Sequence, residues 1–261
     1  MTLKRIHIGG AMRSGTTLLS ALVSDCFALE EACESETHLW RAAPRNRKVH
    51  LTKYPGDEVV FRHVLKKDPN LWFIYMLRDP RDVVVSIHGM DRSTYFTNLR
   101  HWKESVEAAH AIRDCPRFLE VRYEELVRDA DAVQRRVMDF MPFLKKTADF
   151  STWDGRKKLT PQYAKALNGV RKVDPASIGA WRRHKGRLLA QMRLHGDLSE
   201  TLIALGYEKN KAWLQELEGV EPNERLGLVA DRIPAGKAFR RRLREHLHAR
   251  LYLIQRAVLE R

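Results

Sequence analysis

A glycine-rich stretch near the N-terminus has the residues to bind a phosphate group. In GGAMRSGTT, residues 9–17, Gly10 and Gly15 have the spacing of the phosphate-loop pattern G-x-x-x-x-G-K-[ST], but Thr16 stands where that pattern has lysine. Backbone N–H groups of such a loop bind anions at the start of a helix, and Arg13 could supply the positive charge that the lysine would supply. The stretch therefore predicts a phosphate site, although an ordinary glycine turn would also explain the loop taken alone.

A second stretch, YMLRDPRDVVVSIHG (75–89), predicts another anion site. Arg78 follows a strand-like run, and Ser86 comes eight residues later, on a helix that follows. The two side chains could converge on a phosphate; a solvated network of arginine and aspartate is the alternative. Two separate anion sites indicate a ligand with phosphates at two positions, whereas a nucleoside triphosphate has a single phosphate chain.

Four apolar runs of strand length alternate with segments of helical periodicity. The runs are RIHIG (5–9), KVHLTKY (48–54), LWFIYML (71–77) and RFLEVRY (117–123). The helical segments are 15–29, 57–67, 81–88, 94–113 and 129–141. This alternation predicts an α/β fold, with a P-loop-type parallel sheet flanked by helices. Ligands of such sheets bind beyond the carboxyl ends of the strands, which is where both predicted anion sites lie.

Charge and cysteine content restrict the partners and the location. The 261 residues carry a formal net charge of +14. This charge suits a polyanionic ligand, an anionic membrane surface or nucleic acid, but no nucleic-acid-binding motif occurs, so we expect no nucleic-acid partner. Cys26, Cys33 and Cys115 form no C-x-x-C pair, and a strand-like run starts just after Met1. We therefore expect a reduced, cytoplasmic protein without disulfides, structural zinc or a leader peptide.

The C-terminal part of the chain differs from the rest. Residues 142–178 are polar and basic and predict a long loop, and helical spacing returns at 186–205. We expect one domain over residues 1–208 and a basic helical extension over residues 209–261. The extension has six large apolar side chains at helical spacing: Phe239, Leu243, Leu247, Leu251, Ile254 and Val258. We expect this face to pack on the domain; contact with an anionic membrane surface and pairing in a homodimer are the alternatives.

Four motifs, in order along residues 4–208, resemble the cytosolic and Golgi sulfotransferase family, which uses 3′-phosphoadenosine 5′-phosphosulfate (PAPS). They are RSGTTLL (13–19), RDPRDVVVS (78–86), VRYEELVRD (121–129), and SIGAWRRH (177–184) followed by LGYE (205–208). Arginine in the first motif, where steroid-type members carry lysine, places the chain nearer to the bacterial, tyrosylprotein and carbohydrate branches. The resemblance implies a PAPS-dependent enzyme that needs no metal.

The resemblance also implies which residues bind PAPS. The loop 13–17 would bind the 5′-phosphosulfate, Arg78 with Ser86 the 3′-phosphate, and Tyr123 the nucleotide. Candidate neighbours of the adenine or the 3′-phosphate are Arg171, Lys172, Ser177 and Trp181. The predicted PAPS-binding set is Arg13, Ser14, Gly15, Thr16, Thr17, Arg78, Ser86, Tyr123, Arg171 and Lys172, of which the last two lie in a loop that matches no quoted motif of the family.

For the transfer itself, three residues are candidates. Sulfuryl transfer is helped by positioning and by cations that face the leaving oxygen, a role that suits Arg13 and Lys53. The TKYP around Lys53 resembles the lysine-proline motif of tyrosylprotein and carbohydrate members, although a strand-end lysine reaching into solvent is the alternative. Glu36, followed by threonine, resembles the glutamate-threonine of the tyrosylprotein group, which implies a general base. The other candidates for the base are Glu34 and His38.

The sequence favours transfer of a sulfuryl group from PAPS to a hydroxyl of a carbohydrate, glycolipid or other small-molecule acceptor. Two other functions stay open. A P-loop kinase or nucleotide hydrolase would use ATP and magnesium, and the missing lysine at Thr16 argues against it. A non-catalytic polyanion-binding protein would need only a basic cleft, with no glutamate near the loop.

Overall fold

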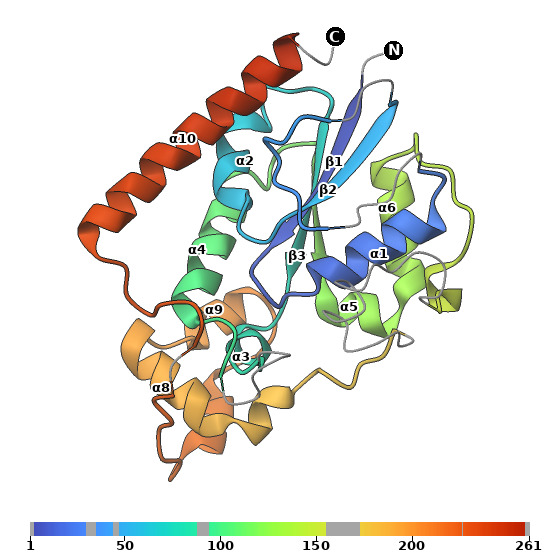
Figure 1. The fold of residues 1–261 in the computed structure, drawn as a ribbon. Helices are drawn as coiled ribbons and strands as arrows, with labels where there is room; N and C mark the ends of the chain where they lie inside the picture. Colours follow the sequence, from blue (N-terminus) through green and yellow to red (C-terminus); the bar gives the residue numbers. More distant parts are fainter. Residues whose placement is uncertain are drawn as a thin grey trace.

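The sheet at the centre of the molecule is parallel. The computed structural model describes residues 3–29, 35–43, 47–87, 94–154, 173–225 and 227–258. Within these ranges one sheet has the order β2-β1-β3-β4 (Figure 1), with β1 (Lys4–Gly10), β2 (Val49–Lys53), β3 (Leu71–Leu77) and β4 (Phe118–Arg122). All neighbouring strands pair in parallel. The predicted α/β class and parallel sheet are therefore confirmed.

Helices cover both faces of the sheet, and this is why the central strand β3 is apolar throughout. Ile8 and Ile74 are fully buried on one face, and Phe73 and Tyr75 are fully buried on the other. The first face is covered by α1 (Thr16–Cys26), α5 (Tyr123–Arg128) and α6 (Ala130–Phe140). The second is covered by α2 (Glu58–Val64), α3 (Pro80–Val84), α4 (Leu99–His110) and α8 (Lys185–His195).

The helices are shorter than the predicted segments, for example α4 within 94–113, and two predictions differ in a further way. The segment 81–88 was expected to be helical throughout, but α3 ends at Val84. The segment 186–205 contains two helices, α8 and α9 (Ser199–Ala204), because Gly196 takes a left-handed backbone conformation between them. Three short 3₁₀ helices complete the described C-terminal half: η1 (Phe150–Thr152), η2 (Ala180–Arg183) and η3 (Lys211–Leu217).

The long C-terminal helix α10 (Ala235–Val258) packs against α2 with the face opposite to the one the sequence indicated (Figure 1). Its buried residues are Glu245, Ala249 and Tyr252. The six apolar residues of the predicted packing face are all exposed. The expectation that this face packs on the domain is therefore wrong. Polar side chains of the opposite face make specific ion pairs with α2, α4 and the loop after α2, and these outweigh the hydrophobic pattern.

The carboxyl ends of β1 and β3 determine where a ligand can bind. From β1 the chain crosses to β2 on one side of the sheet, and from β2 it returns past β1 to β3. The helices that follow β1 and β3 consequently lie on opposite faces, and ligands of open parallel sheets bind at such a reversal. The loop with Arg13 follows β1 and Arg78 follows β3, so both predicted anion sites lie at this reversal.

Candidate functional site

The phosphate loop between β1 and α1 depends on its glycines. Gly10 and Gly15 have φ values of 146° and 99°, and Arg13 also has a positive φ, of 71°. A Cβ on Gly15 would lie 2.6 Å from the ring of Tyr123, so only glycine fits there. Gly15 is also the N-cap of α1 and makes no side-chain cap, so N–H groups of the first turn are left to bind an anion.

Two buried polar atoms beside this loop lack a partner among the described residues. They are the hydroxyl of Ser14 and the Nε of Arg78. A buried polar group without a hydrogen bond costs free energy. A ligand with acceptor oxygens at this place could accept hydrogen bonds from the hydroxyl of Ser14 and the Nε–H of Arg78. The loop residues therefore fit a phosphate or phosphosulfate group.

The two arginines of the predicted anion sites meet in one cluster. Arg13 donates from Nε to the hydroxyl of Ser86 at 2.7 Å, and Arg78 donates from Nη1 to the carbonyl of Arg13 at 2.9 Å. The guanidinium of Arg78 lies over the ring of Tyr123, 4.2 Å from its centroid. Burial, and then the charge of Arg78, lowers the pKa of Arg13. An anion bound between the two guanidinium groups would offset both the burial of the Arg13 charge and its repulsion by Arg78.

A buried ionic network holds the strand end from which Arg78 projects. Asp79 caps α3 by accepting from the backbone N–H of Arg81 at 2.9 Å, and its carboxylate also pairs with the guanidinium of Arg81 at 2.7 Å. Arg81 reaches Glu208 at 2.6 Å, and Asp79 donates its backbone N–H to Glu124. The acidic and basic residues around Arg78 therefore fix its backbone, and the structure assigns Asp79 this framework role.

Residues 177–181 approach the same site from the far end of the domain. Arg78 donates from Nη2 to the carbonyl of Ser177 at 3.1 Å. Asp82 accepts the backbone N–H groups of Gly179 at 2.8 Å and Trp181 at 3.0 Å. The motif that begins at Ser177 is thus brought to the arginine cluster, although Trp181 itself is buried in the core.

Lys53 and Glu36 form an ion pair beside the phosphate loop. The Nζ of Lys53 lies 2.9 Å from Oε1 of Glu36 and 3.2 Å from the hydroxyl of Thr17. Lys53 is 1% exposed, whereas the side chain of Glu36 is 43% exposed. Thr37 donates its backbone N–H to the carbonyl of Lys53, which fixes this segment to the end of β2. A buried cation and a solvent-facing carboxylate thus sit next to the first turn of α1.

His38 and Asp57 form a hydrogen-bonded pair next to Glu36. His38 donates from Nδ1 to Oδ1 of Asp57 at 2.9 Å, and the backbone N–H of Leu39 donates to the other carboxylate oxygen. Burial raises the pKa of Asp57, while the bond from His38 opposes that shift. The Nδ1 bond leaves Nε2 of His38 as its basic nitrogen, so His38 also has the arrangement of a general base.

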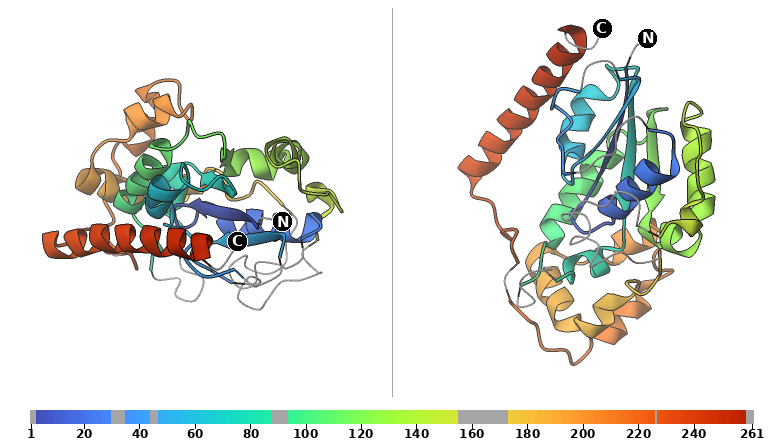
Figure 2. Two further views of the ribbon diagram at one scale, coloured as in Figure 1. Left: turned by 90° about the horizontal axis from the view of Figure 1, so that it is seen from above. Right: turned by 45° about the vertical axis from the view of Figure 1, so that its right-hand side comes forward.

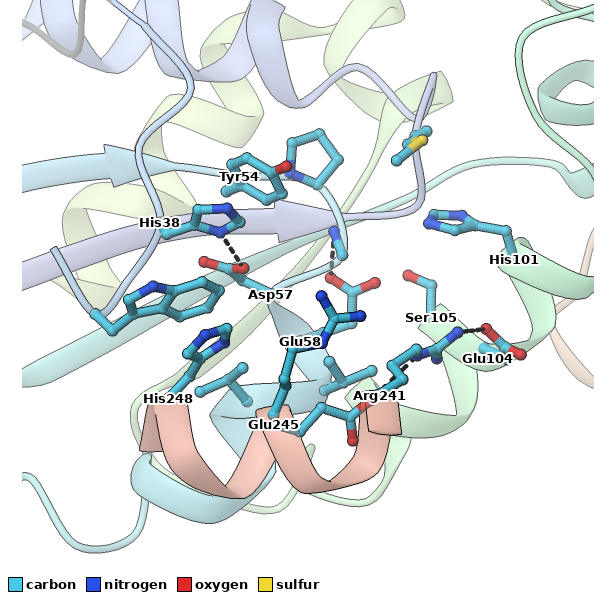
Figure 3. Close-up of a pocket in the computed structure, with 17 residues that line it drawn as sticks. His38, Tyr54, Asp57, Glu58, His101, Glu104, Ser105, Arg241, Glu245 and His248 are labelled. Atoms are coloured by element: carbon cyan, nitrogen blue, oxygen red, sulfur yellow. Dashed lines mark hydrogen bonds and ion pairs between the residues drawn. The ribbon is translucent and has the colours of Figure 1, made fainter. Parts of the chain in front are cut away.

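A cavity of about 430 Å³ opens beside this pair, between the loop after β2, α4 and α10 (Figure 3). Stacked or tilted rings form one wall. The distance between ring centroids is 3.5 Å for Tyr54 and His38, 4.0 Å for His38 and Trp40, and 3.8 Å for Trp40 and His248. Arg241 of α10 faces the other side, paired with Glu104 of α4 at 2.8 Å. The full lining is Met12, His38, Trp40, Tyr54, Pro55, Gly56, Asp57, Glu58, Val59, Val60, His101, Glu104, Ser105, Arg241, Arg244, Glu245 and His248.

Two lining residues that the sequence did not single out have unusual environments. Glu58 accepts the backbone N–H groups of Gly10 at 3.3 Å and Gly56 at 3.1 Å, and burial raises its pKa to about 7. It therefore joins the phosphate loop to the loop after β2. Burial lowers the pKa of His101 to about 4, and its Nδ1 has no partner among the described residues. The only sequence signal for this group is an acidic pair shortly after a strand end, at Asp57 and Glu58.

Most of the predicted site residues lie at one edge of the sheet, where the loop after β1, the end of β2 and the turn after β3 meet. That set is Arg13, Ser14, Gly15, Thr16, Thr17, Glu36, Lys53, Arg78, Ser86 and Tyr123. Three other candidates lie outside the described residues: Glu34, Arg171 and Lys172. The functional roles of all these residues stay predictions.

Residues 39–142 match the model of the sulfotransferase family. The matched segment contains Lys53, Arg78, Ser86 and Tyr123, whereas the phosphate loop and Glu36 precede it. A protein-tyrosine sulfotransferase of Drosophila melanogaster is 23% identical over 275 residues, which cover 81% of this chain. The chain spans 55% of the length of that relative.

Solved sulfotransferase structures share the fold. A sulfotransferase domain from the Synechococcus PCC 7002 olefin synthase superposes with a TM-score of 0.50 at 18% identity, covering 69% of this chain and 88% of that domain. A sulfotransferase domain from the curacin biosynthetic pathway gives a TM-score of 0.50 at 14% identity, covering 69% and 90%. At these identities the likeness shows the α/β fold alone.

Proposed function

We propose that this protein is a PAPS-dependent sulfotransferase that moves a sulfuryl group to an acceptor hydroxyl. One observation carries the proposal. Lys53 and Glu36 form an ion pair, with 2.9 Å between Nζ and Oε1, and this pair lies beside the phosphate loop. The cluster of Arg13, Ser86 and Arg78 lies at the neighbouring strand end. Cations, a carboxylate and two anion anchors are thus gathered at one sheet edge, as in-line transfer from a phosphosulfate requires.

The residues at this edge fit PAPS as the co-substrate, which would supply the sulfuryl group and a phosphate as leaving group. The loop 13–17, with the unpartnered hydroxyl of Ser14, would hold the 5′-phosphosulfate. Arg78 and Ser86 would hold the 3′-phosphate, with Tyr123 beside the nucleotide. Arg13 of the loop donates to Ser86 of the second anchor, and Arg78 donates to the carbonyl of Arg13. Each phosphate would therefore interact electrostatically with both arginines.

Lys53 and Glu36 would divide the chemistry between them. Lys53 is buried beside Thr17 of the loop, so its ammonium can neutralise charge that develops on the leaving oxygen. Glu36 would accept the proton of the acceptor hydroxyl. Because Glu36 is paired with Lys53, arrival of the co-substrate would draw the ammonium towards the phosphate and free the carboxylate for this role.

The cavity beside the His38–Asp57 pair would receive the acceptor. Its volume, about 430 Å³, fits a ring-bearing group rather than a folded chain, and the ring wall from Tyr54 to His248 suits stacking of a sugar or phenol ring. The acceptor would be a carbohydrate, a glycolipid or another small molecule. The Drosophila relative is named for tyrosine, which adds a phenolic hydroxyl to these classes.

A kinase or nucleotide hydrolase fits the site less well. Thr16 replaces the lysine that such enzymes use on the phosphates, and Asp79, the acidic residue after β3, is already occupied by Arg81. A protein that only bound polyanions would gain nothing from a carboxylate beside Lys53, since it repels the ligand. We therefore expect activity without a metal ion, and a cytoplasmic location stays a prediction.

Calorimetry tests the two-anchor site directly. The protein should bind adenosine 3′,5′-bisphosphate more tightly than ATP with magnesium, because Arg78 engages a phosphate that ATP lacks. Arg78→Ala should weaken bisphosphate binding by at least about tenfold, since charge-assisted hydrogen bonds are lost. Arg113→Ala removes the same charge from an exposed position and is the matched control. A preference for ATP, or equal affinities of the two variants, would refute the proposal.

A further inference from the structure

The C-terminal helix α10 has two faces of different character. Its inner face is held by ion pairs to the domain: Arg62 to Glu245 at 2.9 Å, Arg241 to Glu104 at 2.8 Å, and Arg256 to Asp68 at 2.6 Å. Tyr252 also donates its hydroxyl to Asp68 and is fully buried. These contacts extend over four turns, so they fix which face of α10 points outwards.

The outer face is apolar and is not covered by the described elements (Figure 2). Its side chains are 41% to 70% exposed: Phe239, Leu243, Leu247, Leu251, Ile254 and Val258. We call these six residues the outer stripe. In the described part of the chain, only Leu194 and Leu228 are other exposed large hydrophobic residues, and they lie apart from α10. A contiguous stripe of this kind marks a contact surface.

The charges around the outer stripe are of one sign. Arg240 and Arg250 lie three or four residues from stripe members, hence on the same face, and Arg244 lies at its edge. All three side chains are exposed. The one acidic residue among the described residues of α10, Glu245, is buried on the inner face. The outer surface of the helix therefore combines apolar and cationic groups with no carboxylate.

This charge pattern decides between the two partners that could cover the stripe. A second copy of the chain would bring the same arginines to the contact and no carboxylate to neutralise them, so self-pairing would be opposed by like charges. The surface of an anionic lipid bilayer offers acyl chains to the leucines and phosphates to the arginines. No helix in the described ranges is both long and apolar enough to cross a bilayer, so α10 would lie along the surface.

We propose that the outer stripe of α10 docks the protein flat on anionic lipid bilayers. The apolar side chains enter the boundary between headgroups and acyl chains, and Arg240, Arg244 and Arg250 contact lipid phosphates. This inference is independent of the proposed transferase chemistry, because it concerns the exposed face of α10 and none of the residues assigned to PAPS. Arg244 also lines the cavity, so the docked face borders its rim.

Flotation of the full chain with lipid vesicles tests the proposal. The chain should float with vesicles of phosphatidylcholine that contain about one third phosphatidylglycerol. With vesicles of phosphatidylcholine alone it should remain in the bottom fraction of the gradient. Leu247→Glu should weaken binding by at least about tenfold, because a carboxylate replaces an inserted side chain. Joint replacement Arg240→Gln and Arg250→Gln should weaken it by about fivefold for each arginine.

Leu228→Glu is the matched control, because Leu228 is 56% exposed and Leu247 is 53% exposed, and the change in charge is the same. Leu228→Glu should bind vesicles as the unchanged chain does. The proposal is overturned if both variants bind equally, if neutral vesicles bind equally well, or if no vesicle binds. It is also overturned if the chain is a dimer in sedimentation velocity that only Leu247→Glu dissociates. Circular dichroism confirms that each variant is folded.

Discussion

Arg13 places a guanidinium group in a loop that has no lysine at Thr16. Its backbone takes the left-handed conformation inside the loop, at φ 71°, and its side chain extends from there to Ser86. A lysine at the position of Thr16 would instead enter the first turn of α1. The cation is thereby placed between two strand ends, where it contacts the anchor around Arg78 as well as the loop.

The base can be assigned by comparing two variants. Glu36→Gln should lower kcat by about 10²- to 10⁴-fold while leaving the affinity for adenosine 3′,5′-bisphosphate unchanged, because a general base is lost. His38→Asn keeps a donor for Asp57 and should lower kcat by less than about tenfold. Turnover is measured with sulfur-labelled PAPS and an acceptor found by screening a metabolite extract. The opposite ranking of the two variants would assign the role to His38.

Glu58 should make stability depend on pH. Its pKa in the folded protein, about 7, is above the ordinary value of 4.5, so the folded state binds the proton more tightly than the unfolded state. This contribution is fully present below pH 4.5 and is lost as the pH rises through 7. Between these values the unfolding free energy should fall, relative to Glu58→Gln, by at most about 1.4 kcal/mol per pH unit.

Glutamine at this position is a suitable reference because both backbone bonds go to one oxygen of Glu58, which an amide carbonyl can replace. Urea unfolding of the two proteins at several pH values between these limits gives the difference. If the unfolding free energies of the two proteins depended on pH in the same way, Glu58 would not change its protonation on unfolding. The bonds to Gly10 and Gly56 would then be made by a carboxylate of ordinary pKa.

At the scale of elements, charged residues of the motif 78–86 serve to join segments of the chain. The short helix α3 begins at Pro80, capped by Asp79, and its Arg81 reaches Glu208 near the end of the domain. Asp82 holds the turn before η2 through two backbone N–H groups. These contacts place Arg78 and Ser177 together, although they are 99 residues apart in the sequence.

The orientation of α10 can be tested by two neighbouring substitutions. Tyr252→Ala should lower the free energy of unfolding by about 3–5 kcal/mol, because a fully buried ring and its bond to Asp68 are removed. Leu251→Ala, one residue away on the exposed face, should change it by no more than about 0.5 kcal/mol. Denaturant unfolding measures both values. A larger loss for Leu251→Ala would mean that the outer stripe is the packed face.

At the scale of the whole molecule, the parallel sheet with β1 at its centre converts separate motifs into one site. The order β2-β1-β3-β4 places the loop after β1, Lys53 at the end of β2 and Arg78 after β3 at the same edge. The α2, α4 and α10 layer then closes the cavity beside that edge (Figure 3). The binding test for Arg78 and the vesicle test for α10 therefore examine two different surfaces of one molecule.

The sequence alone determined the features that depend on local pattern. Apolar runs of strand length fixed the strands, and a glycine spacing with Arg13 in it identified the phosphate loop, because both are properties of a few neighbouring residues. It also grouped Arg78 and Lys53 as candidates, since residues after parallel strands share one edge, whereas Glu36 came from the resemblance to the tyrosylprotein group.

Only the tertiary structure decided which face of α10 is buried and what surrounds the site. The helical pattern favoured packing of the outer stripe, but ion pairs such as Arg256 with Asp68, 188 residues apart, hold the opposite face inwards. The environment of Glu58 likewise depends on Gly10 and Gly56, brought together by β1 and the loop after β2. Burial and long-range pairing arise from the assembled chain, so no local pattern of residues contains them.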